Sequence, residues 1–460
     1  MQAEELATAI EDRSARGIAA TVGRLIRSGA LGAGDRLPTV REIAHGLGVS
    51  PTTVSEAWQA LAAAGAIESR GRAGTFVRDG SGPHGPERYQ RITRGPGIYS
   101  HDLSTGTPDP ALLPDLQHAL ALAGAGDQTT NYFDDPVDPA LLDVLERRWP
   151  FPPERLTVVD GCLDALDRIT SVLVHFGDRV LVENPTFPPL LDLLGDLGAE
   201  IVPLELDEQG PTAESLAEGL ELAPVACFLQ PRAHNPTGVA VDEVRAKELA
   251  GLLAEHPGVI VVENDHGAEI SSAPLHSLGV SLPDRTVHIH GFSKSHGPDL
   301  RLAAVGGAAS VVDAVVTRRR LGPGWSSRIL QRVLAAMLCD DRTVATVAQA
   351  RDEYARRRHE VAAALAARGV TTAGSDGIHL WVPVRDEQTA LVSLASQGIG
   401  ASPGAPFATG PLEGDHIRLT VGLVDRGVDE LADHVAMAAQ GPPPIDRRRR
   451  AHESGSPTAG

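Results

Sequence analysis

The chain reads Gly291-Phe292-Ser293-Lys294-Ser295-His296-Gly297-Pro298-Asp299-Leu300-Arg301 directly after an apolar run that is typical of a β-strand. This stretch holds one of only two lysines in the sequence, and an arginine stands seven positions after it. The other lysine, Lys247, lies in an amphipathic helical pattern, which indicates an ordinary solvated charge. A lysine amine can hold an aldehyde cofactor as a Schiff base, and a guanidinium can bind that cofactor's phosphate. Lys294 and Arg301 would also suit a surface loop, so their surroundings in the sequence have to distinguish the two readings.

The composition limits the class of protein. A length of 460 residues suggests about three domains, and 42% hydrophobic residues support sizeable cores. The sequence contains no run of about 18 uncharged apolar residues, and its acidic start lacks the apolar core of a signal peptide. Cys162, Cys227 and Cys339 show neither metal-ligand spacing nor a disulfide framework, so no metal site is predicted. We therefore expect a cytoplasmic protein without a membrane segment.

Charge is distributed unevenly along the chain. The whole sequence carries a formal charge of −19, but residues 13–78 contain nine arginines, no lysine and four acids, which gives 9 − 4 = +5. A basic segment in front of an acidic body is compatible with nucleic-acid binding by that segment alone.

The basic segment has the pattern of a winged helix. Apolar residues recur at helical spacing, and Thr39 and Ser50 can cap two helices that are separated by a glycine-containing break at Gly48. Two helices joined in this way form a helix-turn-helix. The predicted elements are helices over 14–29, 40–47 and 51–64 and wing strands over 67–70 and 75–77.

Four motifs in this segment resemble the winged helix of the GntR family. They are Leu37-Pro38-Thr39-Val40-Arg41, Leu47-Gly48-Val49-Ser50, Thr53-Val54 and Gly71-Arg72-Ala73-Gly74-Thr75-Phe76-Val77. The resemblance implies a DNA-binding domain over 13–78 whose third helix enters the major groove. The alternative is a helical domain whose arginines only solvate it. By position, the resemblance implies DNA contacts from Arg41, Thr52, Thr53, Arg70 and Arg72.

Two segments lack apolar periodicity. Residues 79–100 begin with a run rich in Gly and Pro and predict a flexible linker, and residues 441–460 predict a disordered tail. The Arg447–Arg450 run in that tail could add nonspecific DNA affinity, although a solvated basic tail is the simpler interpretation.

From Leu156 onward, short apolar runs alternate with helical patterns. This alternation predicts a mostly parallel, doubly wound α/β sheet, in which ligands bind at the carboxyl ends of the strands. The predicted strands are 156–159, 180–183, 201–204, 225–229, 259–262, 287–290 and 303–306.

Residues with chemical potential follow several of these strands. Gly161 opens a helix whose free amides at Cys162 and Leu163 could hold a phosphate. Phe187 offers an aromatic face, although a core position would also explain it. Asn235, within His234-Asn235-Pro236-Thr237-Gly238, offers an amide, and Arg418 on a later strand could grip a carboxylate.

In this order and spacing, the set resembles the fold-type-I enzymes of the aspartate-aminotransferase fold, which use pyridoxal 5'-phosphate. The resemblance implies a large domain over 101–310, which binds the cofactor, and a small domain over 311–440. Lys294 would be the catalytic residue that binds the aldehyde and shuttles protons, and Arg418 would bind the carboxylate of a substrate or effector. Tyr132 resembles the tyrosine that one subunit lends to its neighbour's cofactor phosphate. The implied cofactor-binding residues are Lys294, Cys162, Leu163, Phe187, Asn235, Asn264, Asp265, His266, Ser293, Arg301 and Tyr132.

The sequence departs from the family at the pyridine ring. Asn264 stands where the family carries an aspartate, and an amide stabilises a protonated ring nitrogen less well than a carboxylate. Asp265 could serve instead, so the sequence leaves open which of the two faces the ring. His266 replaces the usual tyrosine, and Gly291 stands where a phosphate-binding serine or threonine is common. These changes weaken catalysis more than cofactor capture.

A winged helix joined to this fold resembles the MocR subfamily of GntR regulators. The sequences of residues 231–238 and 293–301 resemble its PtsJ-like branch. The resemblance implies a homodimeric, head-to-tail transcription factor that binds operator DNA and senses pyridoxal phosphate or an amino compound. Two alternatives stay open, namely an active aminotransferase with a regulatory head, and a body without cofactor that serves only dimerisation.

Overall fold

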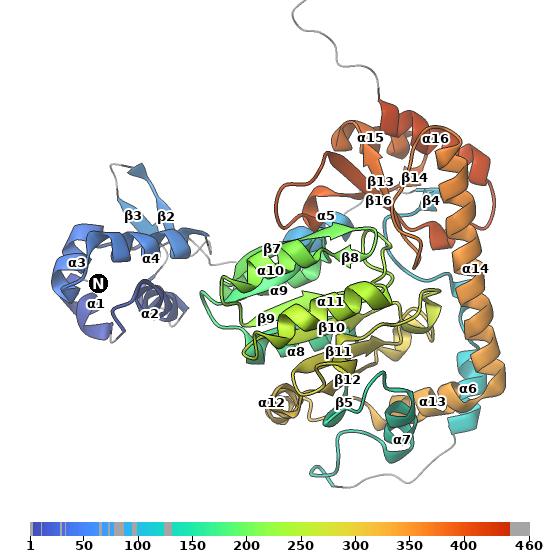
Figure 1. The fold of residues 1–460 in the computed structure, drawn as a ribbon, viewed down its shortest axis with the longest axis horizontal. Helices are drawn as coiled ribbons and strands as arrows, with labels where there is room; N and C mark the ends of the chain where they lie inside the picture. The colour runs from blue at the N-terminus through green and yellow to red at the C-terminus, as the bar shows by residue number, and fades with distance from the viewer. Residues whose placement is uncertain are drawn as a thin grey trace, which may run out of the picture.

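The computed structural model describes residues 3–10, 12–27, 30–32, 34–63, 67–71, 74–77, 87–93, 99–123 and 131–441. A small N-terminal domain is followed by a large α/β body (Figure 1). Within these ranges, no helix has both the length and the apolar character that crossing a membrane requires.

The N-terminal domain contains the predicted helices in the predicted order. They are α2 (Ala15–Arg27), α3 (Val40–Leu47) and α4 (Pro51–Ala63), preceded by an unpredicted helix α1 (Ala3–Ala9). A capping box starts α3, because Thr39 Oγ1 accepts from the amide of Glu42 and the Glu42 carboxylate accepts from the amide of Thr39. Gly48 ends α3 in the left-handed conformation, with φ 68°.

The predicted wing is also present. Strands β2 (Ile67–Ser69) and β3 (Thr75–Val77) pair antiparallel, and the unpredicted strand β1 (Arg36–Leu37) pairs with the other edge of β3. Leu37, Ile67 and Val77 from these strands are buried in one core with the apolar faces of the helices. This core also contains Leu6 and Ile10 from outside the predicted segment 13–78, and Phe176 of the body packs against it.

The body is built on an eight-stranded sheet in the order β5-β12-β11-β10-β9-β6-β7-β8. All seven predicted strands are confirmed. They are β5 (Arg155–Val159), β6 (Arg179–Asn184), β7 (Glu200–Asp207), β9 (Ala226–Leu229), β10 (Ile260–Asp265), β11 (Thr286–Gly291) and β12 (Ala303–Gly307), with the short strand β8 (Gly210–Pro211) at one edge. The pairs among β11, β10, β9, β6 and β7 are parallel, whereas β12 runs antiparallel to β5 and β11.

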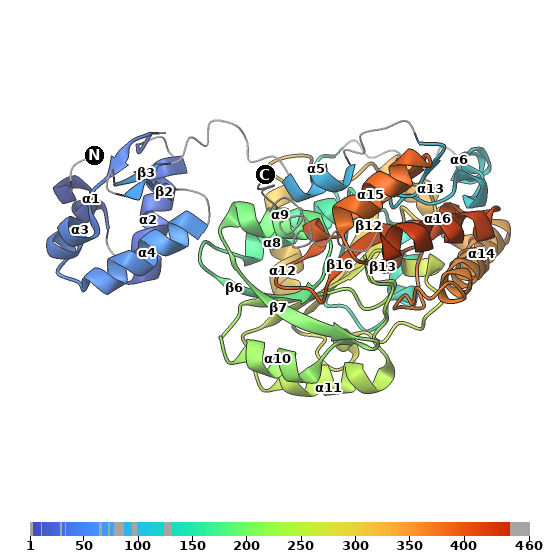
Figure 2. The ribbon, with the colours of Figure 1, turned by 90° about the horizontal axis from the view of Figure 1, so that it is seen from above.

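Helices cover both faces of this sheet (Figure 2). The helices α8 (Cys162–Leu173), α9 (Pro188–Leu197) and α12 (Ala309–Arg319) pack on one face, and α10 (Ala213–Leu220) and α11 (Glu243–Ala254) pack on the other. Near-continuous apolar runs such as Val180–Val182 are explained by this double coverage, since both faces of each strand are buried.

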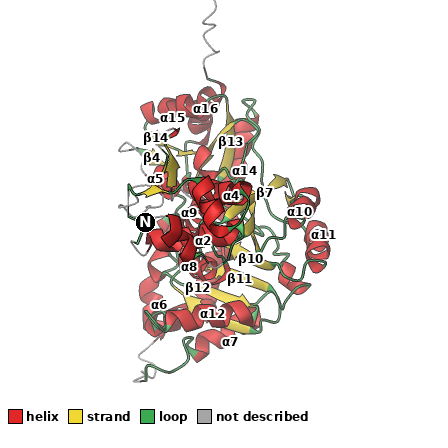
Figure 3. Ribbon diagram, turned by 90° about the vertical axis from the view of Figure 1, so that its left-hand side faces the viewer, coloured by secondary structure: helices red, strands yellow, loops and turns green. Residues whose placement is uncertain are grey.

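A smaller domain lies at one end of the body (Figure 3). Its sheet has the order β13-β16-β15, formed by β13 (Leu380–Val384), β16 (Asp415–Leu419) and β15 (Ser402–Pro403). The helices α14 (Asp341–Ala366), α15 (Glu387–Ser396) and α16 (Val428–Gln440) contribute to its core. Strand β14 (Ile399–Gly400) pairs with β4 (His101–Asp102) from the start of the body.

The large-domain core extends beyond residue 310, where the sequence placed the boundary. Helix α12 packs in the core that contains α8, and α13 (Arg328–Cys339) packs with Val158 and Ala304 of the central sheet. The predicted start of the small domain at residue 311 is therefore too early, because these two helices still bury their apolar faces on the large sheet. Helices α6 (Leu116–Ala123) and α7 (Pro139–Arg148) pack beside α13.

The predicted flexible linker contains a helix. Helix α5 (Glu87–Thr93) begins where the Asp192 carboxylate of α9 accepts from the amides of Arg88 and Tyr89, at 3.2 and 3.0 Å. Arg88 Nη1 donates to the carbonyls of Pro406 and Ala408 in the small domain. These seven residues are docked on the body, which corrects the prediction for them, whereas residues 79–86 and 94–98 lie outside the described residues. The predicted tail, from 442 onward, also lies outside them.

Candidate functional site

Lys294 lies in the turn after β11, at the carboxyl edge of the parallel strands. The residue as a whole is partly exposed, but its amine is enclosed by protein. Burial lowers the pKa of Lys294 below its ordinary value, and the positive charge of Arg418 lowers it further, while Cys162 and Asp265 act in the opposite direction. The structure thus gathers residues that are far apart in the sequence around one amine that is more easily deprotonated than a surface lysine.

An anion cradle lies beside this amine. Helix α8 begins after Gly161, which has φ 99°, and its first turn has no side-chain cap from the described residues. Arg301 reaches this turn, because a Cβ on Gly161 would lie 3.7 Å from its guanidinium carbon. The amides of Cys162 and Leu163, the helix dipole and the guanidinium together favour a phosphate-sized anion. Ser293 precedes Lys294 in the same turn and is partly buried.

The side chain of Cys162 packs against the backbone of Gly291. A Cβ on Gly291 would lie only 2.5 Å from Sγ of Cys162, so the thiol fills the space that a serine or threonine at 291 would need. Burial raises the pKa of Cys162 to about 11, with an opposing effect of Lys294, so the thiol is neutral at ordinary pH.

The predicted ring site brings Phe187 and Asn264 together. Both residues line one narrow cavity with Thr186 and Gln230. Asn264 Oδ1 is buried without a hydrogen-bond partner from the described residues. Asn235 is buried nearby, where its amide N–H donates to Gln230 and its Oδ1 accepts from Arg418 Nη1 at 3.2 Å. The aromatic face of Phe187 and the side-chain amides of Asn264 and Asn235 therefore lie in the same part of the molecule.

His266 lies close to Lys294 with both ring nitrogens buried; neither nitrogen has a hydrogen-bond partner within 3.5 Å in the described part of the chain, and the backbone of Ala233 lies close enough to raise the pKa of the ring. Burial lowers the pKa of His266 well below its ordinary value, and Lys294 lowers it further, so the imidazole is neutral. Buried polar groups of proteins are nearly always hydrogen-bonded. The orphaned atoms of His266 and Asn264, beside an enclosed amine, fit a flat, polar group that the polypeptide does not itself supply.

Arg418 is a buried cation on β16. Burial lowers its pKa to about 10, and among the described residues no carboxylate forms an ion pair with it. Its guanidinium donates to Asn235 and to the carbonyl of Ser104, and it lies 5.2 Å from the centroid of the Phe407 ring. A buried charge without a counter-charge is costly unless a ligand provides one, so a carboxylate ligand is the chemically matching group.

Asp265 faces a different set of partners. Its carboxylate is held by Nε and Nη2 of Arg232, and Oδ1 also accepts from the amide of Ala268 at 3.0 Å. Burial alone would raise the pKa of Asp265, but Arg232 holds it below its ordinary value. Alternation along β10 turns Asp265 away from Asn264, so Arg232 holds this carboxylate on the other side of the strand, while its charge still acts on Lys294.

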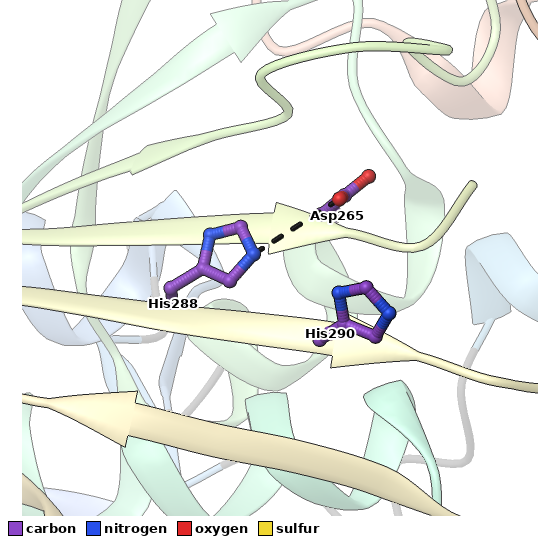
Figure 4. A group of neighbouring side chains, drawn as sticks. All are labelled: Asp265, His288 and His290. Atoms are coloured by element: carbon purple, nitrogen blue, oxygen red, sulfur yellow. Dashed lines mark ion pairs between the residues drawn. The ribbon is translucent and has the colours of Figure 1, made fainter. Parts of the chain in front are cut away.

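Asp265 lies in one cluster with His288 and His290 of β11 (Figure 4), of which Asp265 and His288 are buried and His290 is partly buried. One potential ligand atom from each residue lies within 4.8 Å of the others. His288 Nδ1 lies 2.9 Å from Glu263, and His290 Nε2 lies 2.9 Å from Glu269. Because Arg232 already neutralises the Asp265 carboxylate, this cluster is a compensated ion network behind the site.

Tyr132 does not reach the site of its own chain. Its side chain is 86% exposed and Phe133 beside it is 94% exposed, while the Tyr132 ring lies 6.3 Å from that of Trp325. The exposure is compatible with a role across a subunit interface.

The predicted DNA-contact residues lie on the N-terminal domain. Arg41 of α3 and Thr52 of α4 are exposed, and Thr53 is partly exposed with its amide donating to Ser50 Oγ at 3.1 Å. Arg70 stacks over Phe76 at 4.9 Å and pairs with Glu68, so its charge is partly compensated. Arg72 lies outside the described residues.

Sequence reasoning missed three parts of this site. His379 is buried close to Arg418 and Lys294, Gly106 packs against both His379 and Arg418, and Phe407 lies against Arg418. His379 directly precedes β13, Gly106 follows β4 and Phe407 follows β15. Most of the predicted residues instead follow strands of the large sheet at their carboxyl ends. The isolated histidine directly before an apolar strand, at residues 379–384, was the available signal.

Two family models match the two parts of the chain. Residues 100–435 match "Aminotransferase class I and II", and residues 14–77 match "Bacterial regulatory proteins, gntR family". The winged helix joined to an aminotransferase fold, predicted from the motifs, is confirmed by these matches.

Relatives with the same two parts are similar along most of the chain. The vitamin B6 salvage pathway transcriptional repressor PtsJ of Salmonella typhimurium is 33% identical over 436 residues, which cover 93% of this chain and 99% of that protein. The HTH-type transcriptional regulator TauR of Rhodobacter capsulatus is 30% identical over 431 residues, which cover 83% of this chain and 87% of that protein.

Solved structures share the fold of the body. LysN, the alpha-aminoadipate aminotransferase of Thermus thermophilus, complexed with N-(5'-phosphopyridoxyl)-L-leucine, has a TM-score of 0.66 at 21% identity over 77% of this chain and 96% of that one. Kynurenine aminotransferase of Pyrococcus horikoshii has a TM-score of 0.65 at 23% identity over 76% of this chain and 93% of that one. This likeness concerns the fold alone.

Proposed function

The chain belongs to the aminotransferase class I and II family and carries a gntR-family regulatory domain, which is the combination found in MocR-type regulators. From this family membership, we propose that the protein is a transcriptional regulator that senses pyridoxal 5'-phosphate. The carrying observation is the enclosed amine of Lys294 beside buried polar atoms that lack partners within the described residues. The similarity to PtsJ, a transcriptional repressor of the vitamin B6 salvage pathway, supports a B6-derived ligand.

We assign the cofactor-holding roles as follows. Lys294 would hold the aldehyde, the amides of Cys162 and Leu163 with Arg301 would hold the phosphate, and Ser293 would support that turn. Phe187 stacks on the ring, and Asn235, Asn264 and His266 bind its polar edge. When bound, pyridoxal 5'-phosphate supplies an aldehyde that condenses with primary amines. The lowered pKa of Lys294 keeps part of its amine neutral, which is the form that attacks an aldehyde.

Arg418 indicates that the site binds a second ligand in addition to the cofactor. Its charge lacks a counter-ion among the described residues and lies close to Lys294. We infer that an amino compound with a carboxylate binds there when the cofactor is present, so the effector is the cofactor or an amino acid that reacts with it.

Active transamination is the second candidate, since Lys294 and Arg418 have the arrangement that it needs. Asn264 argues against efficient turnover, because an amide cannot stabilise a protonated ring nitrogen as a carboxylate does. Asp265 does not compensate, since Arg232 holds it on the other side of the strand.

We propose that the DNA-binding domain reads an operator through α4 and its wing, with Arg41, Thr52, Thr53, Arg70 and Arg72 as contacts. Exposed arginine and threonine side chains are typical of phosphate-backbone positioning. The charge of +5 over residues 13–78 favours DNA, although the whole chain is acidic.

A homodimer is part of this proposal. Large apolar side chains are exposed around α6, the Tyr132 loop and α13, and an apolar surface of this kind marks an interaction site. A head-to-tail dimer would cover this surface and could bring Tyr132 to the partner's phosphate cradle. The exposed residues are Leu116, Leu120, Leu122, Tyr132, Phe133, Leu321, Ile329 and Val344.

Helix α5 offers a route from the site to the DNA-binding domain. Phe407 lies over Arg418, its carbonyl accepts from the amide of Thr186 at 2.9 Å, and it packs in one small core with Ile92 of α5. A ligand that moves Arg418 or the 186–187 turn would therefore shift Phe407 and, through it, helix α5, which precedes the body and follows the DNA-binding domain in the chain. Occupancy of the site would in this way change how the head is presented to DNA.

Electrophoretic mobility shift on the DNA upstream of its own gene tests the proposed function. We expect the affinity of the full chain to change severalfold when pyridoxal 5'-phosphate is added, and we expect no change for Lys294→Ala. Lys247→Ala is the matched control, since it removes the only other lysine. Equal DNA affinity with and without the cofactor, in protein that binds the cofactor, would contradict the sensor and leave the second candidate.

A further inference from the structure

His379 lies in the wall of the site and the proposed roles do not use it. It is buried close to Arg418, Lys294 and His266. Its Nε2 is buried and has no hydrogen-bond partner among the described residues. Burial lowers the pKa of His379 well below its ordinary value, and Arg418 and Lys294 lower it further, so the ring is neutral and carries one proton.

Neighbouring hydrogen bonds indicate which nitrogen holds that proton. The amide N–H of Gly106 donates to Thr420 Oγ1 at 3.0 Å, so this oxygen acts as an acceptor there. Thr420 Oγ1 lies 3.5 Å from Nδ1 of His379, and its hydroxyl proton is free to point at that nitrogen. We assign Nδ1 as the acceptor of this hydroxyl, and this assignment puts the ring proton on Nε2. His379 therefore presents an unsatisfied N–H donor inside the site.

Gly106 places this donor next to Arg418. A Cβ on Gly106 would lie 3.4 Å from Cε1 of His379 and 3.5 Å from both terminal nitrogens of Arg418. Cε1 lies between Nδ1 and Nε2 in the ring, so this edge of the imidazole and the guanidinium border the same small space. Gly106 has φ 70°, and its missing side chain leaves that space open.

Positive charge prevails over negative charge around this space. Arg418 carries a positive charge, His379 and His266 are neutral, and Asp265, the acid whose charge acts on Lys294, is held by Arg232. A ligand with a single carboxylate satisfies Arg418 and leaves the His379 donor unmet. A second oxygen-bearing anionic group would satisfy both.

We propose that His379 and Arg418 form a two-part anion subsite, so that the effector is an acidic amino acid whose α-carboxylate binds Arg418 and whose side-chain carboxylate accepts from His379 Nε2. This inference rests on the proposed cofactor-dependent sensor and specifies which amine it reads. His379 is a specificity-determining residue, since it contacts the effector and not the cofactor.

Titration of the full chain saturated with pyridoxal 5'-phosphate tests the subsite. L-glutamate and L-norvaline have the same backbone, and only the first has a side-chain carboxylate. We expect calorimetry and cofactor absorbance to show at least about tenfold tighter binding of L-glutamate, because a hydrogen bond to a charged group is worth about 10- to 100-fold in affinity.

Two variants of His379 distinguish the effect of its N–H donor from the effect of its ring. We expect His379→Phe to lose most of the preference for L-glutamate while binding of L-norvaline stays, and we expect His379→Gln, which keeps a nitrogen donor, to retain most of it. His359→Phe makes the same replacement on an exposed position of α14 and should change nothing.

Three outcomes would overturn the inference. One is equal affinity for the two amino acids in the wild type. Another is an equal loss of both in His379→Phe, which would put His379 on the shared α-carboxylate. The third is protein that binds the cofactor and responds on DNA while neither amino acid produces heat or an absorbance change, in which case only the subsite fails. Failure to bind the cofactor at all would instead remove the proposed function.

Discussion

Arg232 Nη2 lies 2.8 Å from Oδ2 of Asp265, and Nε of the same guanidinium lies 3.1 Å from both carboxylate oxygens. The acid next to Asn264 is therefore bound on the far side of β10. Under the proposed function, the ring nitrogen of a cofactor beside Phe187 would meet the amide of Asn264, which favours sensing over efficient transamination.

Asn264→Asp should increase turnover. A carboxylate at this position favours the protonated ring nitrogen, and each pKa unit gained there is worth about tenfold in the equilibrium. We expect ketoacid formation from an amino acid to rise by about tenfold or more, measured with a coupled assay. Asn131→Asp, on an exposed loop, is the control. Unchanged slow turnover in a variant that still binds the cofactor would show that Asn264 does not limit the chemistry.

Arg418→Leu should shift cofactor capture to higher pH. Burial and the charge of Arg418 lower the pKa of Lys294, and the neutral amine that attacks the aldehyde is present above that pKa. Removal of the positive charge raises the pKa of Lys294, so the capture rate, followed by absorbance, should reach its plateau at a more alkaline pH. Arg426→Leu removes a charge whose side chain is 88% exposed and should leave the profile unchanged. A profile that moves to lower pH would contradict the electrostatic account.

Asp192→Ala should uncouple the site from DNA. The Asp192 carboxylate caps the first amides of α5, and loss of a helix cap costs about 1 kcal/mol. We expect cofactor affinity to remain and the cofactor-dependent change in DNA affinity to shrink, as measured by fluorescence anisotropy of labelled operator. Glu214→Ala, which removes an acid on α10, is the control. A full DNA response in Asp192→Ala would exclude α5 as the route.

Arg41→Ala should weaken DNA binding for all sequences alike. A phosphate contact contributes affinity without sequence preference, and its loss reduces the slope of log K against log salt by about 1. Arg70→Ala should have a smaller effect, since Arg70 is paired with Glu68. Binding measured at several salt concentrations compares the two variants. An unchanged salt slope in Arg41→Ala would remove Arg41 from the interface.

Periodicity and capping predicted the elements because they are local properties. The three helices of the head, its wing and the seven body strands follow from Thr39, Gly48 and the apolar runs, and the structure contains all of them. Helix α5 was missed because its stability comes from Asp192, which lies 103 positions beyond Tyr89 in the sequence. The small-domain boundary was misplaced because burial of α12 and α13 depends on which sheet they meet.

The site was predictable where the residues follow strands. Lys294, Cys162, Asn235 and Arg301 stand at chain positions that parallel topology brings together. The orientation of Asp265 was not predictable, because it depends on Arg232, which lies 33 positions earlier and joins from a loop. His379 escaped notice for a similar reason, since it meets Arg418 only through the antiparallel pairing of β13 with β16, in which Trp381 lies opposite Arg418.

Reduction of the cofactor-loaded protein with borohydride, followed by peptide mass mapping, tests the central claim most directly. The chain has two lysines, so the covalent attachment point is unambiguous. The account predicts one pyridoxyl-phosphate adduct per chain, located on Lys294 and absent from Lys294→Ala. An adduct on Lys247, or none on either lysine after saturation with the cofactor, would contradict it.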